Sequence, residues 1–409
     1  MLVRLRENGD PVVVRLDREV GVALNESRFV DARPVAGHHD WEIRPLSMVG
    51  AIRVGAVEVH VEPKVEVSRV VFMIGYSAVG TKWRSDRVGV EHASDLLLAM
   101  AEVFTRATER AFGGGLLQGY RTVEESLTVV RGRIREMDQL RRRFGVPLPI
   151  EVRFDDYTVD IAENRLIKAA LGKLIRIPGL DGQLRQRIRR LEVLLADVTP
   201  SVRGGAVEKW HPTRLNARYL DALYLAEAIL AGSSFEVGRQ ELNVSGFVID
   251  MARVFEDFVC RVMKDELESI GGRVECQDAW TLDLDDVIKL KPDLVWYPET
   301  VPSSSLARKG AGLVVDAKYK AEKNEAFPNA DVYQMLAYCS SLELPEGHLI
   351  YAKGNEVAKQ HHLRGSSIKV YAHAVDLSLE PAEIVQLLQA LSVSLSDGLQ
   401  AMLAAGASR

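Results

Sequence analysis

The first ninety residues are rich in short β-branched runs separated by turn residues. Residues 12–14 are three valines, Ile52 and Val54 flank an arginine, and in residues 57–62 three valines alternate with polar side chains. Alternation with a period of two is typical of a strand that has one face in water. Gly55-Ala56 lies between the last two runs, so residues 52–62 are predicted to form a hairpin that Pro63 ends.

The spacing of apolar residues changes to the helical period after residue 91. A stripe over residues 96–107 predicts a helix that ends near Gly113. Further helices are predicted over 162–175, 184–195 and 217–231. Beyond residue 236 the predicted order is helix, strand, strand, helix and strand, over residues 253–270, 288–297, 313–320, 332–341 and 346–352.

This order of elements predicts a multidomain protein of the α+β or α/β class. We expect a β-rich segment over residues 1–90 and a mainly helical middle region over residues 91–235. Residues 236–409 are expected to form a mixed sheet flanked by helices. The length of 409 residues agrees with two or three domains.

Charge and composition limit the classes of function. The chain has 52 Lys and Arg against 57 Asp and Glu, a net charge of −5, so any DNA contact must come from local basic patches. It contains neither a long apolar run nor a secretory signal, which predicts a cytoplasmic protein without a membrane segment. Three cysteines without a CxxC pair argue against a cysteine zinc site.

The most informative motif lies on two predicted strands of the C-terminal segment. Pro292-Asp293 belongs to the first strand, and Asp316-Ala317-Lys318 ends the second. Residues i and i+2 of a strand share a face, so Asp316 and Lys318 point the same way, and an adjacent strand can bring Asp293 to that face. A D/E-x-K tripeptide also arises by chance, and Glu62-Pro63-Lys64 is a second one, without a preceding Pro-Asp strand.

This constellation predicts a magnesium site for phosphodiester hydrolysis. The carboxylates of Asp293 and Asp316 and the carbonyl of Ala317 are hard oxygen ligands of the kind that Mg²⁺ prefers. A bound Mg²⁺ neutralises charge on phosphoryl oxygens and lowers the pKa of a water, while Lys318 orients that water or stabilises the transition state. The alternative is that Asp316 and Lys318 form only a surface ion pair.

Two further residues are weaker candidates for the same site. Glu256, on the predicted helix over 253–270, is expected to bind the metal directly or through water, or to position the nucleophile. Gln334, on the next helix, is expected to orient Lys318 or to contact phosphate.

Basic clusters and a glycine-rich segment offer other possible binding sites. Arg141, Arg142 and Arg143 are candidates for DNA-phosphate contacts, and the alternative is a solvated helix face. Residues 75–82 resemble a phosphate loop, but Lys82 stands one place too late for the motif. We therefore expect that this chain binds no nucleotide itself.

Several spaced motifs together resemble the McrC family, the nuclease subunit of two-component systems that cut DNA carrying modified cytosine. The motifs that carry the resemblance are residues 52–64, 72–76, 119–125, 131–134 and 163–168, with Pro292-Asp293, Asp316-Ala317-Lys318 and Tyr333-Gln334. The likeness extends to about residue 355, and residues 356–409 match nothing recognisable.

The resemblance implies a PD-(D/E)xK nuclease whose catalytic residues map onto Asp293, Asp316 and Lys318. It also implies a partner, the AAA+ GTPase McrB, which forms a ring and reads the modified base in double-stranded DNA. The family's amino-terminal part inserts into that ring and stimulates GTP hydrolysis, which suggests residues 1–90 as the partner-binding segment. McrC–McrC dimerisation in the assembled complex is a further expectation.

Three hypotheses follow from these observations. The first is a Mg²⁺-dependent DNA endonuclease subunit that acts with a ring-forming GTPase. The second is an adaptor that activates the GTPase and has a vestigial nuclease, because about 235 residues precede the nuclease segment. The third is a stand-alone repair nuclease of the same superfamily.

Overall fold

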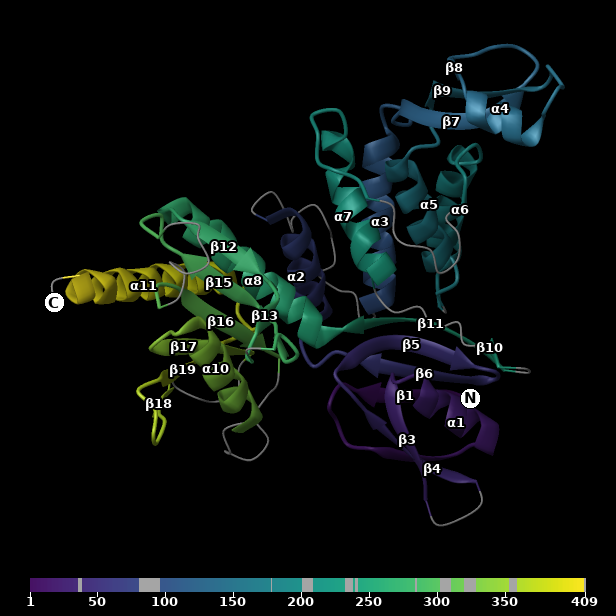
Figure 1. Cartoon of the computed structure of the whole chain (residues 1–409). Helices are drawn as coiled ribbons and strands as arrows, with labels where there is room; N and C mark the ends of the chain where they lie inside the picture. Colours follow the sequence, from purple (N-terminus) through teal and green to yellow (C-terminus); the bar gives the residue numbers. More distant parts are fainter. Residues whose placement is uncertain are drawn as a thin grey trace. The chain divides into compact units, whose positions relative to one another are not determined.

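The computed structural model describes most of the chain (Figure 1). The described residues are 1–35, 39–80, 96–177, 179–200, 209–231, 238–239, 242–283, 285–301, 310–319, 329–352 and 359–407. They belong to two compact units, one formed by Met1–Leu96 with Phe235–Arg409 and the other by Leu97–Ser234. The predicted segments 1–90 and 236–409 therefore share a unit, and most of the predicted segment 91–235 forms the other.

The first unit contains a five-stranded sheet in the order β1-β6-β5-β11-β10. Its strands are β1 (Leu2–Arg6), β5 (Met48–Val54), β6 (Val57–Glu62), β10 (Gly238–Arg239) and β11 (Leu242–Asp250). The predicted hairpin is confirmed, since β5 and β6 pair antiparallel with Val54 opposite Val57. Gly55 takes the positive φ of 57° that this tight turn requires. β11 pairs with β5 although the whole second unit separates them in sequence.

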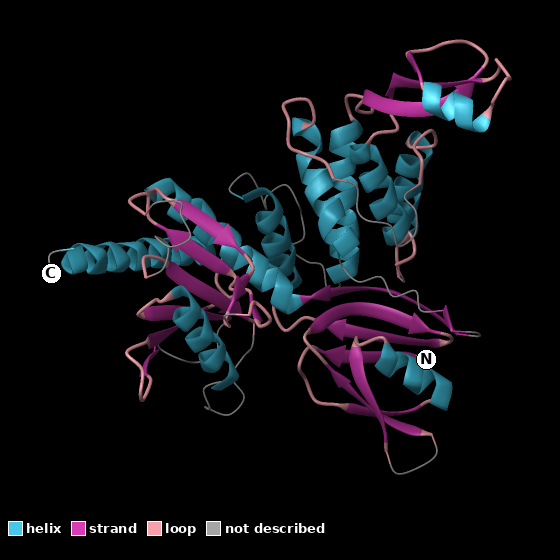
Figure 2. Ribbon diagram, viewed as in Figure 1, coloured by secondary structure: helices cyan, strands magenta, loops and turns pink. Residues whose placement is uncertain are grey.

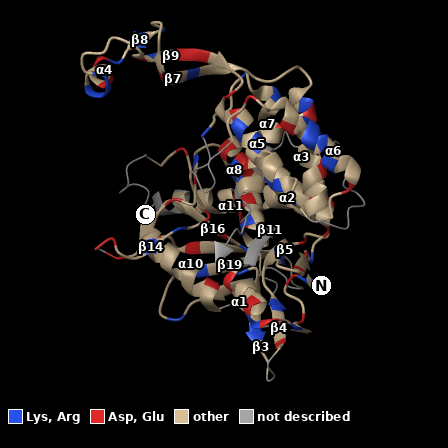
Figure 3. Cartoon of the chain, turned by 90° about the vertical axis from the view of Figure 1, so that its right-hand side faces the viewer, with Lys and Arg blue, Asp and Glu red and all other residues tan. Residues whose placement is uncertain are grey.

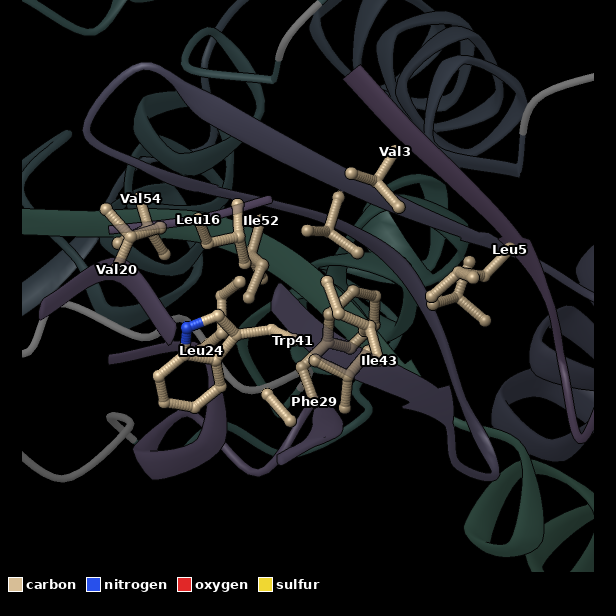
Figure 4. Close-up of a cluster of buried hydrophobic side chains, with 14 of the residues drawn as sticks. Val3, Leu5, Leu16, Val20, Leu24, Phe29, Trp41, Ile43, Ile52 and Val54 are labelled. Carbon is tan, nitrogen blue, oxygen red and sulfur yellow. The ribbon is translucent and has the colours of Figure 1, made fainter. Parts of the chain in front are cut away.

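A smaller sheet and one helix cover this part of the chain. The sheet has the order β2-β4-β3, with β2 (Val12–Arg15), β3 (Val30–Pro34) and β4 (Asp40–Pro45), and the helix is α1 (Arg18–Glu26). Figure 4 shows the shared core, in which Trp41, Phe29 and Leu24 lie among valines and isoleucines of the strands. A Cβ on Gly21 would lie 2.3 Å from the Trp41 ring, so only glycine lets α1 approach it.

Two helices connect this part of the first unit with its C-terminal part. They are α2 (Val67–Val79) and α8 (Met251–Ile270), and they pack on each other. Phe72 and Tyr76 of α2 lie against Phe258 of α8, with ring centroids 5.6–5.8 Å apart. α8 confirms the helix predicted over 253–270, and Asp250 caps it by accepting a hydrogen bond from the Ala252 amide.

The C-terminal part is built on a mixed six-stranded sheet in the order β12-β15-β16-β17-β19-β18. The strands are β12 (Arg273–Cys276), β15 (Leu294–Tyr297), β16 (Leu313–Lys318), β17 (Glu346–Ala352), β18 (Lys359–His362) and β19 (Lys369–Val375). β16, β17 and β19 run parallel, while the outer pairs are antiparallel. The expected mixed sheet with flanking helices is therefore present, and the chain as a whole mixes α and β structure.

Helices cover this sheet on both faces (Figure 2). α10 (Asn329–Leu342) packs Met335, Tyr338 and Cys339 against Val314 and Leu349 of the strands. α8 contacts β12, β15 and β16, and α11 (Pro381–Ala407) contacts β16 and β19. None of the described helices is long and apolar enough to cross a membrane.

The strand predicted over 288–297 is wrong in one respect, because the structure divides it. β14 (Lys289–Leu290) pairs with β13 (Trp280–Thr281) in a separate ribbon, and β15 begins only at Leu294. Pro292 lies between them, and proline has no N–H to donate to a sheet ladder. The break places Asp293 directly before the first residue of β15.

The second unit combines helices with a three-stranded sheet that the sequence analysis did not predict. Its helices are α3 (Leu96–Phe112), α5 (Ala162–Leu174), α6 (Gly182–Leu194), the short 3-10 helix η3 (Ala217–Tyr219) and α7 (Leu220–Ala231). The helices predicted here are confirmed, apart from residues 91–95, which lie outside the described part of the chain. The small sheet has the order β7-β9-β8, with β7 (Gly119–Leu127), β8 (Arg133–Ile134) and β9 (Ile150–Thr158). The helix α4 (Glu136–Arg142) contacts β9.

Asp160 joins the small sheet to the helices of the second unit. Its carboxylate accepts hydrogen bonds from Arg165 of α5 at 2.6 Å, from the amide of Thr199 at 2.8 Å, and from Arg121 of β7. These donors hold the pKa of Asp160 well below its ordinary value. Arg165 belongs to the motif over residues 163–168, so that motif has a structural role in this unit.

Candidate active site

Asp316 and Lys318 lie on the same face of β16, as the strand period predicts. The Lys318 Nζ lies 2.5 Å from Oδ2 of Asp316, and the side chains are only 14% and 2% exposed. Ala317 points to the opposite face and is also buried. The pair is therefore buried, and the alternative of an ion pair at the surface does not describe it.

Asp293 lies beside Asp316 because β15 and β16 pair antiparallel. Its Oδ2 accepts a hydrogen bond of 2.8 Å from the Ala317 amide, so the side chain is attached to the strand that carries Asp316. The backbone carbonyl of Asp293 accepts from the Gln277 amide at 3.0 Å and from the Cys260 thiol at 3.3 Å. These contacts fix both the backbone and the carboxylate of a buried aspartate.

The electrostatics of the site show an excess of negative charge. Burial raises the pKa of Asp316 to about 7, the carboxylate of Asp293 adds to the rise, and Lys318 opposes it. Burial also raises the pKa of Asp293, against the hydrogen bond from Ala317. Burial disfavours the charged form of Lys318, but Asp316 outweighs this effect and raises its pKa. Two buried carboxylates thus share a single lysine.

Glu256, on the second turn of α8, interacts electrostatically with Lys318 and Asp316. Burial raises its pKa to about 7, attraction to Lys318 lowers it, and repulsion from Asp316 raises it. Within the described part of the chain, however, no three Asp, Glu, His or Cys side chains form a group that could hold a metal ion. Glu256 is near the pair but does not complete a three-carboxylate cluster with it.

A cation fits the donor set that the structure does bring together. Oδ2 of Asp316 is buried and, apart from its ion pair with Lys318, accepts no hydrogen bond from any described residue. Lys318 compensates one of the two buried carboxylates, and the second negative charge is costly to bury unless another cation compensates it. Asp293, Asp316 and the carbonyl of Ala317 provide the hard oxygen atoms that Mg²⁺ prefers, leaving its other positions to water and substrate.

Gln334 reaches the site through a tyrosine that sequence reasoning missed. Its Nε2 donates to Tyr338 Oη at 2.7 Å, and the Tyr338 hydroxyl donates to the carbonyl of Lys291 at 3.1 Å. Burial, together with the nearby carboxylates of the site, raises the pKa of Tyr338. This chain of hydrogen bonds holds the segment before Asp293. The spacing of four residues on one helix face could have indicated Tyr338.

The arginines proposed to contact DNA lie at and after the end of α4. The guanidinium groups of Arg142 and Arg143 lie 3.6 and 3.3 Å from the carboxylate of Glu151, which is buried. Arg141 forms no ion pair with any residue that the structure describes. Figure 3 shows basic residues on α4 and acidic residues on β9. Of these three arginines, Arg141 is therefore the one without an ion pair to a described acidic residue.

The small sheet and α4 also expose many apolar side chains. Phe144 is 86% exposed and Met137 is 79% exposed. The other large apolar residues exposed here are Tyr120, Val129, Val130, Ile134, Leu140, Val146, Leu148 and Tyr157. We call this set the apolar tip surface. Exposed apolar patches of this kind mark contacts with other proteins.

Comparison with known proteins agrees with the motifs. A family model described as the McrBC 5-methylcytosine restriction system component matches residues 43–352. The chain is similar to one in the refined half-complex from the tetradecameric assembly of Thermococcus gammatolerans McrB AAA+ hexamers with bound McrC. That match has 17% identity and a TM-score of 0.57, and it covers 96% of this chain and 99% of the other.

A second similar structure is the cryo-EM structure of the Thermococcus gammatolerans McrBC complex, with 18% identity and a TM-score of 0.40, covering 65% of this chain and 88% of the other. The comparison with curated proteins gives no match. The family model spans most of the chain, including the buried site from Glu256 to Lys318. The resemblance seen in the sequence is thereby confirmed, and the chain belongs to the McrBC 5-methylcytosine restriction system component family.

Proposed function

We propose that this chain is a Mg²⁺-dependent endonuclease with a PD-(D/E)xK fold, the nuclease subunit of a GTP-dependent restriction system that cuts modified double-stranded DNA. One observation carries the proposal. Asp293 and Asp316 are buried side by side, the Ala317 amide holds one of them to the strand of the other, and Lys318 is the lysine that faces Asp316. Such a group is costly in a structural core, and it matches what phosphodiester hydrolysis needs.

Each residue of the site has a defined task in this proposal. Asp293, Asp316 and the carbonyl of Ala317 would hold Mg²⁺, which supplies charge neutralisation at the phosphoryl oxygens and a water of lowered pKa. Lys318 directs its ammonium group toward the phosphate or the attacking water. Glu256 positions that water from α8, and Gln334 acts through Tyr338 on the segment before Asp293.

A ring-forming AAA+ GTPase of the McrB type is the proposed partner. The family and the assembly of McrB hexamers with bound McrC both support it. In this proposal the chain stimulates GTP hydrolysis by its partner without binding nucleotide itself, and two copies of the chain meet in the assembled complex. Residues 1–90 stay the sequence-based prediction for the partner-binding segment, and the apolar tip surface offers a second one.

Reconstitution with the cognate GTPase tests this function. With GTP and Mg²⁺, we expect cleavage of modified DNA by the complex and little cleavage by either protein alone. Removal of the metal with EDTA is expected to stop cleavage, and added Mg²⁺ should restore it. Efficient cutting by the isolated chain would instead support a stand-alone nuclease and would overturn the proposed dependence on a partner.

An adaptor is the second candidate function, and the apolar tip surface favours it. In that case the chain would bind the ring and raise its GTPase rate, but no DNA cleavage would appear with Mg²⁺ under any condition. The same reconstituted complex therefore separates the two functions when GTP hydrolysis and DNA cleavage are measured together.

Two substitutions near α4 distinguish DNA contact from partner contact. We expect Arg141→Glu to lower the slope of DNA affinity against salt concentration by about one unit, because one phosphate contact is lost. We expect Phe144→Ser to weaken binding to the GTPase by about tenfold while the salt slope stays unchanged, because an interfacial aromatic is lost. Fluorescence anisotropy with labelled DNA and with labelled GTPase measures both. An unchanged slope for Arg141→Glu would show that Arg141 makes no phosphate contact and belongs to a solvated helix face.

A further inference from the structure

A buried polar cluster connects the amino-terminal sheet to the strand of the candidate active site. Tyr319 follows Lys318 at the end of β16, and its hydroxyl donates to Oε2 of Glu7 at 3.1 Å. The Nζ of Lys64 donates to the backbone carbonyl of Tyr319 at 3.4 Å and lies 4.3 Å from the centre of its ring. Glu7 and Tyr319 are each only 3% exposed, and Lys64 is half-buried.

The amino-terminal sheet holds its two members of the cluster firmly. The Glu7 amide donates to the Glu62 carbonyl at 2.8 Å, which extends the pairing of β1 with β6 by one residue. The Lys64 amide in turn donates to Oε2 of Glu7 at 3.2 Å. Lys64 is the lysine of the Glu62-Pro63-Lys64 tripeptide, which has no nuclease context of its own. Its ammonium group instead contacts the strand that carries Asp316.

Burying the charges of Glu7 and Lys64 is unfavourable unless their contacts compensate for the lost hydration. Burial raises the pKa of Glu7 and lowers the pKa of Lys64, which means that it disfavours the charged form of each side chain. An apolar contact would join the two parts of the unit at lower cost. The ammonium over the Tyr319 ring and on its carbonyl gives what an apolar contact lacks, a fixed direction for the backbone after Lys318.

We propose, on the basis of the nuclease function above, that Lys64 and Glu7 are positioning residues that fix the end of β16 and so hold Lys318 and Asp316 against Asp293. The Tyr319 ring lies on the face of β16 that packs on Phe255 of α8, with centroids 6.0 Å apart. Lys318 and Asp316 occupy the opposite face. A shift of the Tyr319 backbone therefore moves Lys318 and strains the hydrogen bond from Ala317 to Asp293.

Substitution of Lys64 tests the proposal. Lys64→Met removes the ammonium group and keeps the length of the side chain, whereas Lys64→Arg keeps a donor and a cation over the ring. For Lys64→Met in the reconstituted complex, we expect kcat for DNA cleavage to fall by about 10- to 100-fold with little change in KM, because the reacting groups are misplaced. Lys64→Arg should restore most of the lost rate.

A second measurement does not depend on DNA cleavage. Hydrogen exchange of the peptide over residues 313–318, which includes the Ala317 amide, should be faster in Lys64→Met than in the wild type, and Lys64→Arg should reverse the change. Lys168→Met is the matched control, since the Lys168 Nζ also donates to backbone carbonyls, those of Leu195 and Val198, but in the second unit. We expect it to lower the melting temperature without altering either readout.

The outcomes separate this inference from the proposed function. Unchanged exchange over residues 313–318 and unchanged kcat in Lys64→Met would overturn the positioning role, as would a loss that Lys64→Arg fails to restore. If the wild-type complex cuts no DNA, the proposed function fails instead. The exchange measurement then still decides whether Lys64 holds the end of β16.

Discussion

Replacing Asp316 with asparagine is expected to lower DNA cleavage by the reconstituted complex by at least about 10³-fold, because a charged metal ligand is lost from the reacting centre. Asparagine has nearly the same shape, so the fold should survive, and burial of a neutral amide in place of a charged carboxylate removes an unfavourable charge. GTPase stimulation should stay within about twofold of the wild type, because that activity belongs to other surfaces. Single-turnover cleavage and GTP hydrolysis on the same samples measure both.

The control for this substitution is a carboxylate of the same unit that has an ordinary partner. Asp265 forms an ion pair with Arg261 one helical turn away on α8, at 3.0 Å. Asp265→Asn should therefore leave cleavage unchanged. If Asp316→Asn retains wild-type cleavage while Asp265→Asn behaves the same, Asp316 has no part in the reaction and the assignment of the site is wrong.

Replacing Asp160 with alanine is expected to destabilise the second unit by about 3 kcal/mol, because the donors around a buried carboxylate lose their partner. Arg165 and Thr199 both donate to this carboxylate, so the substitution loosens the end of the small sheet, the start of α5 and the segment after α6 together. Thermal unfolding should show a loss of about 10 °C for the transition of this unit.

The pH dependence gives a check on the mechanism of this loss. Because the folded-state pKa of Asp160 is lowered, its contribution to stability is complete above the ordinary pKa of aspartate and declines as the pH falls toward the folded value. The difference between wild type and Asp160→Ala should therefore shrink below about pH 4. Asp155→Ala is the matched control, since the Asp155 carboxylate accepts an exposed hydrogen bond from Thr122 and, among the described residues, no other. An equal loss in both variants would contradict the role given to Asp160.

Local patterns were sufficient for the elements that carry the candidate site. The period of two over residues 313–318 placed Asp316 and Lys318 on one face, and the amphipathic stripe over 253–270 placed Glu256 on a helix beside it. The strand predicted over 288–297 runs through Pro292, which has no N–H to donate to a sheet ladder. Pro292 separates β14 from β15 and so starts the buried strand right after the aspartate.

The contacts that join distant parts of the chain had no local signal. β11 completes the amino-terminal sheet from beyond the second unit, and Lys64 reaches Tyr319 across 255 residues. The small sheet was missed for a different reason. Its strands expose Tyr120 and Tyr157, so the usual expectation that one face of a strand is apolar and buried gives no clear alternation there. Surfaces of this kind become visible only once the fold is known.

The position of a bound divalent ion tests the central claim most directly. Crystals of the protein grown with Mn²⁺, a substitute for Mg²⁺ that can be located by anomalous diffraction, should show a peak between the carboxylates of Asp293 and Asp316, at roughly 2.0–2.4 Å from their oxygens. The peak should disappear in Asp316→Asn. Occupancy only at exposed acids such as Asp285, with none between Asp293 and Asp316, would contradict the metal-dependent nuclease site.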